Sequence, residues 1–212
     1  MTPKRPPAVL VIAILHFVFG GFDLLGGLCG LALIASGAAD FFAKLGGPNQ
    51  GLNQVEMQQA LDAKLPAYKA VRFSDVGIAL VLGTLLVAGG FGLLTMKPWG
   101  RTLSLAYALL SSAYTIFRMI YALALEMPEM RLYLEDKLQQ APAGPQRGGL
   151  EMAMVLMTVM PIIVHVAALI YPTAVLIIMF RPSIRAAFRG ERTVASISEQ
   201  ANDPEAEDRW RV

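Results

Sequence analysis

Ionisable side chains occur inside long apolar stretches of this sequence, where each is costly unless it finds a partner. His16 and Asp23 lie in the first such stretch, and Arg118 and His165 lie in the third and fourth. Charged or titratable groups in this setting are typical of ion or proton pathways, of counter-ions, and of buried pairs that stabilise packing. These residues are therefore the first candidates for chemistry.

Polar residues also recur around Arg118 at a helical spacing. The intervals alternate between three and four, which keeps the whole series on one narrow face of an α-helix. The series is Ser104, Tyr107, Ser111, Tyr114, Arg118 and Tyr121. The first stretch shows the same rhythm at His16, Gly20, Asp23, Gly27 and Gly30, and the fourth shows it at Thr158, Pro161, His165, Ala168 and Pro172. Three such faces predict helices that pack around a polar seam.

Depth along the helices suggests which of these residues meet. At a rise of ~1.5 Å per residue, Asp23 lies about 22 Å from the inner end of its helix and Arg118 about 10 Å from the outer end of its own. In an apolar core of ~30 Å these levels nearly coincide, so we expect Asp23 and Arg118 to pair. Snorkelling of Arg118 to the outer interface is the alternative. Asp75, near the predicted end of its helix, is expected to be interfacial.

The two histidines are expected to form a second, inner layer of the same seam. Their alternative role is that of hydrogen-bonded packing residues, and this is the reading we favour. The spacing offers no Ser/His/Asp arrangement, H-E-x-x-H, P-loop or dinucleotide-binding glycine motif. We therefore expect no catalytic residues, no metal site and no cofactor.

Composition identifies the elements that must position these side chains. The chain has 212 residues, of which 55% are hydrophobic and only 16% charged, whereas soluble domains carry about a quarter charged residues. The apolar excess is concentrated in four segments, each long enough to cross a bilayer. They are residues 8–36, 73–96, 102–125 and 152–180. The sequence therefore predicts an all-α integral membrane protein, an up-down bundle of four transmembrane helices.

The first segment follows Lys4 and Arg5, as a signal peptide does, but its apolar run is much longer than a cleavable signal requires. A signal anchor is therefore favoured, with cleavage after Ser36-Gly37-Ala38 as the alternative. Small residues let a neighbouring backbone approach closely. Those of this segment, expected to pack against a second helix, are Gly20, Gly26, Gly27 and Gly30.

The sequence KPWGR at residues 97–101 separates the second and third apolar segments. Pro98 cannot continue a helix, Gly100 permits a reversal, and Trp99 suits a lipid headgroup region. We expect a tight hairpin here, on the cytoplasmic side. Lysines and arginines without nearby acids mark the segments assigned to that side: Lys4, Arg5, Lys97, Arg101, Arg181, Arg185 and Arg189. Both termini are thus predicted to be cytoplasmic.

Three further segments lie outside the membrane in this topology. Both outer loops are expected to contain short amphipathic helices, one following a capping box of Asn53 and Glu56 and one beginning at Pro128. After residue 180, the arginines around Ile184 and Phe188 suit a helix on an anionic leaflet. The remainder of residues 181–212 is polar and aperiodic, and we expect it to be disordered.

The stretches VIAILHFVFGGFDLLGGLCG and KPWGRTLSLAY carry a resemblance. The chain resembles small uncharacterised bacterial membrane proteins with four helices, in which a basic Pro-Trp hairpin joins two apolar helices. This resemblance implies a multi-pass protein of the bacterial inner membrane and brings no activity with it.

Two functions from different classes are compatible with these features. The leading hypothesis is a non-enzymatic structural or accessory membrane protein, which self-associates or binds another membrane protein through the glycine face of its first helix. The alternative is a small permease or proton-coupled carrier that uses the intramembrane Asp, Arg and His residues. The lipid bilayer is the expected surrounding in both cases, and nucleic acid is not an expected partner.

Overall fold

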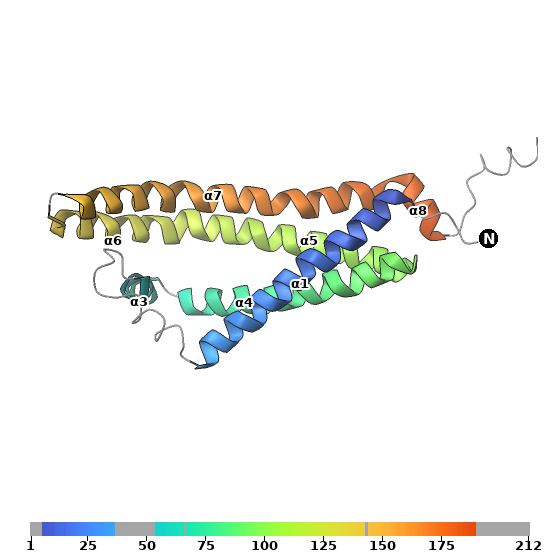
Figure 1. Cartoon of the computed structure of the whole chain (residues 1–212), viewed down its shortest axis with the longest axis horizontal. Helices are drawn as coiled ribbons and strands as arrows, with labels where there is room; N and C mark the ends of the chain where they lie inside the picture. Colours follow the sequence, from blue (N-terminus) through green and yellow to red (C-terminus); the bar gives the residue numbers. More distant parts are fainter. Residues whose placement is uncertain (1–5, 37–53, 66, 143, 190–212) are drawn as a thin grey trace, which may run out of the picture.

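The computed structural model describes residues 6–36, 54–65, 67–142 and 144–189, whose regular structure is entirely helical (Figure 1). The helices are α1 (Pro7–Ser36), α3 (Gln54–Lys64), α4 (Tyr68–Leu94), α5 (Pro98–Tyr121), the π-helical turn η1 (Ala122–Glu126), α6 (Met127–Gln140), α7 (Pro145–Phe180) and α8 (Pro182–Arg189). The stretches long and apolar enough to cross a membrane are Pro7–Leu33, Tyr68–Leu94, Pro98–Gln140 and Arg147–Phe180. The prediction of four membrane-length helices is confirmed.

The long helices alternate in direction along the chain (Figure 1). Helix α1 crosses α4 in the most extensive contact between any two helices, α4 packs on α5, and α5 with α6 runs beside α7. The start of α1, the α4–α5 turn and α8 lie at one end of the molecule, which we call the terminal end. Helix α3 lies toward the other end, in contact with α6.

Glycines bring α1 and α4 together. A Cβ atom on Gly20 would lie 2.8 Å from the Cβ of Leu86 and 3.0 Å from the carbonyl oxygen of Gly83, closer than such atoms approach. A Cβ on Gly27 would lie 2.7 Å from Leu80 Cδ2. Hydrogen in place of a side chain therefore lets the two backbones meet, in the manner common to membrane helix pairs.

The α4–α5 connection is the tight turn that KPWGR predicts. Helix α4 ends at Leu94, Met96 takes a positive φ of 53°, and Pro98 opens α5 in the first turn, where a missing N–H is not needed. The Lys97 N–H donates to the carbonyl of Gly92 at 2.9 Å. A Cβ on Gly92 would lie 2.4 Å from the Cα of Gly100, so glycine is required on both sides of this turn.

Helices α5 and α6 are not separated by a loop. Residues 98–140 form one continuous helical stretch, and the expected helix start at Pro128 lies inside it. Proline lacks an N–H and its ring clashes with the carbonyl of an ordinary α-helical turn. Widening of the helix relieves this clash: the Met127 N–H donates to the carbonyl of Ala122, five residues back, in the π-helical turn η1.

Two short helices pack against the long ones. Leu61 and Leu65 of the α3 segment are buried in an apolar cluster with Met57, while the Asn53 end of the expected capping box lies outside the described residues. In α8, Ile184 and Phe188 are buried in the same core as Val9 and Met179. The apolar face of α8 is therefore covered by protein instead of lipid. Residues 190–212, expected to be disordered, also lie outside the described part.

The α1–α4 contact predicts that alanine substitutions at two adjacent glycines change the stability of the protein by different amounts. Gly20→Ala forces α1 and α4 apart and is expected to lower the free energy of unfolding by about 1–3 kcal/mol relative to Gly21→Ala. The control is closely matched, because a Cβ on Gly21 meets nothing within 4 Å. Both changes remove a helical glycine, so the gain in helix propensity cancels in the difference. Thermal unfolding in detergent measures the pair, and equal melting temperatures would contradict the close contact.

Candidate functional site

The polar face of α5 lies against three other long helices. Its members Ser104, Tyr107 and Ser111 are buried, and Tyr114 and Arg118 are partly buried. Partners for these side chains come from α1, α4 and α7 and from η1. The structure divides the seam into two clusters, one around His16 and the other around Arg118.

The first cluster joins α1, α5 and α7 through His16, whose exposed fraction is 0%. His16 Nε2 lies 2.9 Å from the hydroxyl of Ser104 on α5, and Nδ1 lies 2.5 Å from the hydroxyl of Tyr171 on α7. The ring of Tyr107 packs beside both, with its centroid 6.0 Å from that of His16 and 6.1 Å from that of Tyr171. Both ring nitrogens of this buried histidine therefore have partners.

The hydrogen-bond directions in this cluster follow from the protons available. The hydroxyl of Ser104 donates its single proton to the carbonyl of Gly100 at 2.8 Å, so toward His16 it accepts. Nε2 of His16 then donates, and Nδ1 accepts from the hydroxyl of Tyr171. A neutral imidazole fits this pattern, and burial disfavours the charged form.

Two glycines of α4 provide the space for the imidazole. A Cβ on Gly89 would lie 3.3 Å from both His16 Cδ2 and Ser104 Oγ. A Cβ on Gly90 would lie 3.1 Å from the Cβ of His16 and 3.2 Å from the carbonyl oxygen of Ala13. The His16 cluster is thus closely packed, and α4 is the fourth helix in contact with the imidazole.

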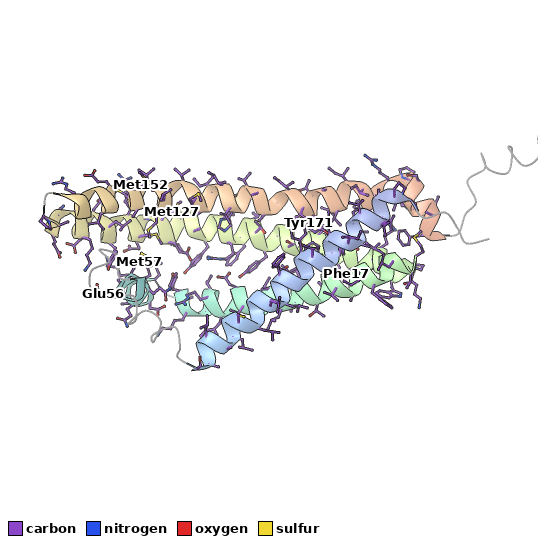
Figure 2. All side chains as sticks on the ribbon, viewed as in Figure 1. Phe17, Glu56, Met57, Met127, Met152 and Tyr171 are labelled. Atoms are coloured by element: carbon purple, nitrogen blue, oxygen red, sulfur yellow. The ribbon has the colours of Figure 1, made fainter. Side chains whose placement is uncertain are left out.

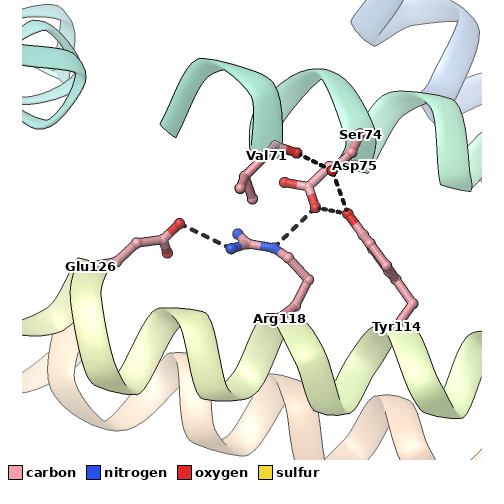
Figure 3. A network of polar contacts seen from close by, with 6 residues as sticks. All are labelled: Val71, Ser74, Asp75, Tyr114, Arg118 and Glu126. Atoms are coloured by element: carbon pink, nitrogen blue, oxygen red, sulfur yellow. Dashed lines mark hydrogen bonds and ion pairs between the residues drawn. The ribbon is translucent and has the colours of Figure 1, made fainter. Parts of the chain in front are cut away.

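The second cluster centres on Arg118 (Figure 3). Its Nε lies 3.0 Å from Asp75 Oδ1 on α4, and its Nη1 lies 3.0 Å from Glu126 Oε1 at the end of η1. The hydroxyl of Tyr114 donates to the same oxygen of Asp75 at 2.5 Å. The Arg118 side chain is 18% exposed and that of Glu126 14%. One guanidinium thus links two carboxylates through separate nitrogens, which its rigid fork permits.

The π-helical turn explains how Glu126 reaches Arg118. Eight residues of regular α-helix, at about 100° each, would place Glu126 about 80° away from the direction of Arg118. A π-helical turn holds one extra residue. With η1 between them, Arg118 and Glu126 are therefore oriented as residues seven apart in an α-helix are, and both side chains lie on one face. The wide turn that precedes Pro128 therefore also brings the two members of this ion pair together.

Asp23 does not pair with Arg118, so that expectation is wrong. Arg118 binds Asp75, because α4 begins at Tyr68, five residues earlier than predicted, and Asp75 lies two turns inside the helix instead of at its end. Asp23 is half-buried on α1, and no described side chain forms a hydrogen bond or ion pair with it. The expectation for Asp75 named no partner, whereas this carboxylate binds both Arg118 and Tyr114.

The expected layer of two histidines does not form. His165 Nδ1 lies 2.6 Å from the carbonyl of Pro161 in its own helix. The residue of α7 that reaches His16 is Tyr171, six positions further on, or about 9 Å along the helix axis. The predicted end of this helix at residue 180 is right, but His165 lies 15 residues, or about 22 Å, from it, whereas His16 lies nine residues, or about 14 Å, from the start of α1.

The remaining residues of the predicted seam lie in different surroundings. The ring of Tyr121 lies under Arg118, with 5.5 Å between Cζ and the ring centroid. A Cβ on Gly30 would lie 3.2 Å from Val76 Cγ2, so Gly30 faces α4 as Gly20 and Gly27 do. Gly26 differs from these, because a Cβ there would meet nothing within 4 Å.

Sequence reasoning missed three partners in these clusters: Tyr171, Asp75 and Glu126. Tyr171 falls one residue before Pro172, which was counted on the polar face of its segment. Glu126 precedes Pro128 by two residues. A proline within an otherwise helical run was the one feature of the sequence that could have predicted a widened turn there. Nothing in the local pattern distinguished Asp75 from an ordinary residue at a helix start.

The protein is helical, with four helices long and apolar enough to span a membrane, and the polar groups of the two clusters bind one another. No protein-family model, curated protein or solved structure matches the chain. Among the described residues no group of three or more His, Cys, Asp and Glu could hold a metal ion.

The Arg118 cluster predicts a large cost for removing its cation. Arg118→Gln leaves two carboxylates without a counter-charge and is expected to lower the free energy of unfolding by about 1–3 kcal/mol. Adding Glu126→Gln should cost less than the sum of the single changes, because one stranded charge disappears. Thermal unfolding in detergent measures all three variants.

The control for this prediction is Arg131→Gln. Arg131 forms an ion pair of similar length with Glu135, 2.9 Å, but its side chain is 69% exposed. Exposed pairs contribute little, so this change should stay within about 0.5 kcal/mol of the wild-type value. Equal effects of Arg118→Gln and Arg131→Gln would contradict a stabilising role for the cluster.

Proposed function

We propose that this chain is a non-enzymatic structural or accessory protein of a bacterial cytoplasmic membrane, built as an up-down bundle of four transmembrane helices. The observation that carries the proposal is the His16 cluster. His16 and Ser104 are completely buried, and their hydrogen bonds are used within the protein. A proton carrier needs groups that exchange protons with water, and this cluster instead links helices to one another.

The surfaces of the long helices support a role that depends on contact with lipid or another membrane protein. The most apolar part of α7 has no buried residue, and α1 exposes Phe22 by 70% and Leu25 by 63%. Apolar surface on this scale requires a covering. The glycines Gly20, Gly27 and Gly30 already face α4, so a second copy or partner would use an exposed side of α1, such as the one on which Gly26 is open.

Charge at the terminal end supports the proposed orientation. Lys97 and Arg101 at the α4–α5 turn and Arg181 and Arg185 beside α8 belong to elements that lie at this end (Figure 1). By the positive-inside rule the terminal end is cytoplasmic, which places both termini inside the cell. Helix α3 and the α6–α7 connection are then external.

The orientation predicts the outcome of reporter fusions. Fusions after Met96 and after Arg189 should report a cytoplasmic location, whereas fusions near Asn53 and Pro142 should report an external one. A phosphatase that is active only outside the membrane and a fluorescent protein that is active only inside make the distinction. An external signal from the fusion after Met96 would contradict the topology, because that turn joins the second and third membrane helices.

Asp23 favours a second candidate function, the proton-coupled carrier. It is a half-buried acid within a membrane-length helix, with no hydrogen bond or ion pair to a described side chain. A lone carboxyl group in this position is the residue that a transport role would require.

Proton flux separates the two functions. The purified chain is reconstituted into liposomes, and flux is followed with an enclosed pH-sensitive dye under an imposed membrane potential. The structural role predicts a rate equal to that of empty liposomes and no effect of Asp23→Asn. Flux in the wild type that Asp23→Asn abolishes would overturn the proposal in favour of the carrier.

The stability of histidine variants of the purified chain tests the structural role directly. His16→Phe removes the acceptor of Tyr171 and the donor to Ser104, and should lower the free energy of unfolding by about 1–3 kcal/mol. His165→Phe is the matched control, because His165 binds only its own helix among the contacts described for it. Equal stability of the two variants would contradict a structural role for the His16 cluster.

A further inference from the structure

Methionines are concentrated in the hairpin formed by α6 and α7. Six of the 11 methionines of the chain lie between residues 127 and 160. Met127 and Met130 are one helical turn apart on α6, and Met154 and Met157 are one turn apart on α7. Residues three apart lie on the same side of a helix, so each helix carries a pair of methionines on one side.

The two pairs face one another. All four methionines line a single hollow of about 10 Å³ between α6 and α7, together with Arg131, Leu134 and Thr158. This volume is about the least that holds one water molecule or an ion of similar size. We call these four residues the methionine quartet.

A third helix covers part of this region. Met57 of α3 is buried in a cluster with Leu61 and Leu65, and Met130 and Met157 of the quartet pack against that cluster. Figure 2 shows Met57 on α3 and Met127 on α6 toward the same end of the molecule, away from the terminal end. The quartet is therefore walled by apolar side chains on the α3 side.

The donor atoms of the hollow indicate what it would bind. Thioether sulfur is a soft, uncharged ligand that favours Cu(I) over hard divalent cations such as Mg²⁺ or Ca²⁺. The expectation of no metal site rested on histidine, cysteine and carboxylate spacing, which does not test for thioethers. The one cation in the lining, Arg131, is turned to Glu135 at 2.9 Å, so its charge is offset.

We propose that the methionine quartet binds one Cu(I) ion, with Ag(I) as its chemical equivalent. The facing pairs supply up to four sulfur ligands from two helices, which suits a soft monovalent ion. The alternative is that the flexible methionine side chains only fill the space between α6 and α7. This inference does not depend on the proposed accessory role.

Cu(I) titration tests the site. The full chain, carrying Cys29→Ser because the exposed thiol of Cys29 would itself bind copper, is purified in detergent without oxygen. Cu(I) is supplied with ascorbate and competed with a chromophoric Cu(I) chelator. We expect one ion per chain, a higher melting temperature in its presence by mass action, and sulfur-only coordination in the X-ray absorption spectrum.

Leucine variants identify the ligands, since leucine conserves the volume of methionine. The variant M127L/M130L/M154L/M157L should lose Cu(I) binding by more than about tenfold, as metal sites do when their ligand shells are altered. The control is M152L/M160L, which changes two methionines of α7 that are 61% and 50% exposed and lie outside the hollow. It should bind as the parent does.

Three outcomes would overturn the inference. These are no uptake of Cu(I) by the parent chain, retained binding by the quadruple variant, or equal losses in the quadruple and control variants. Helix content from circular dichroism checks that the quadruple variant is folded. If it is not, M127L/M130L and M154L/M157L are measured separately, and unchanged binding in both would reject the site.

Discussion

A hydrogen-bonding group in an apolar interior must find its partner there, because no water is present to supply one. This constraint shapes the contacts of α5, whose polar face requires partners along its length. Ser104 meets His16 and Arg118 meets Asp75 and Glu126, so that α1 and α4 are held on the same face of α5. Tyr171 brings α7 to the same place. The polar side chains thus join α5 to its neighbours, as the glycine contacts join α1 to α4.

Much of the fold follows from the sequence because bilayer thickness and proline impose simple rules. Long apolar runs predicted the four long helices, and Lys97-Pro98-Trp99-Gly100-Arg101 predicted the turn between α4 and α5. The boundaries were less predictable. Polar residues such as those of 126–140 extend a helix as readily as they form a loop, and the local pattern does not reveal whether Pro128 begins a helix or only widens one.

The residues that α5 contributes to the candidate site were predictable, and their partners on other elements were less so. The spacing on α5 selected Ser104, Tyr107, Tyr114 and Arg118, all of which contact side chains of other helices. Which residue meets which depends on crossing angles and on helix starts, and neither is encoded in local spacing. An error of five residues at the start of α4 was enough to hide Asp75 as the partner of Arg118.

The continuous helix from residue 98 to residue 140 has a mechanical consequence. At 1.5 Å per residue it is about 64 Å long, roughly twice the ~30 Å thickness of a hydrocarbon core. Since α7 runs beside it, the surplus in the proposed topology is a two-helix stalk outside the membrane. The tip of a flexible loop of the same length would contact both lipid and solvent. In that topology the stalk instead holds the connection after Gln140 away from the bilayer.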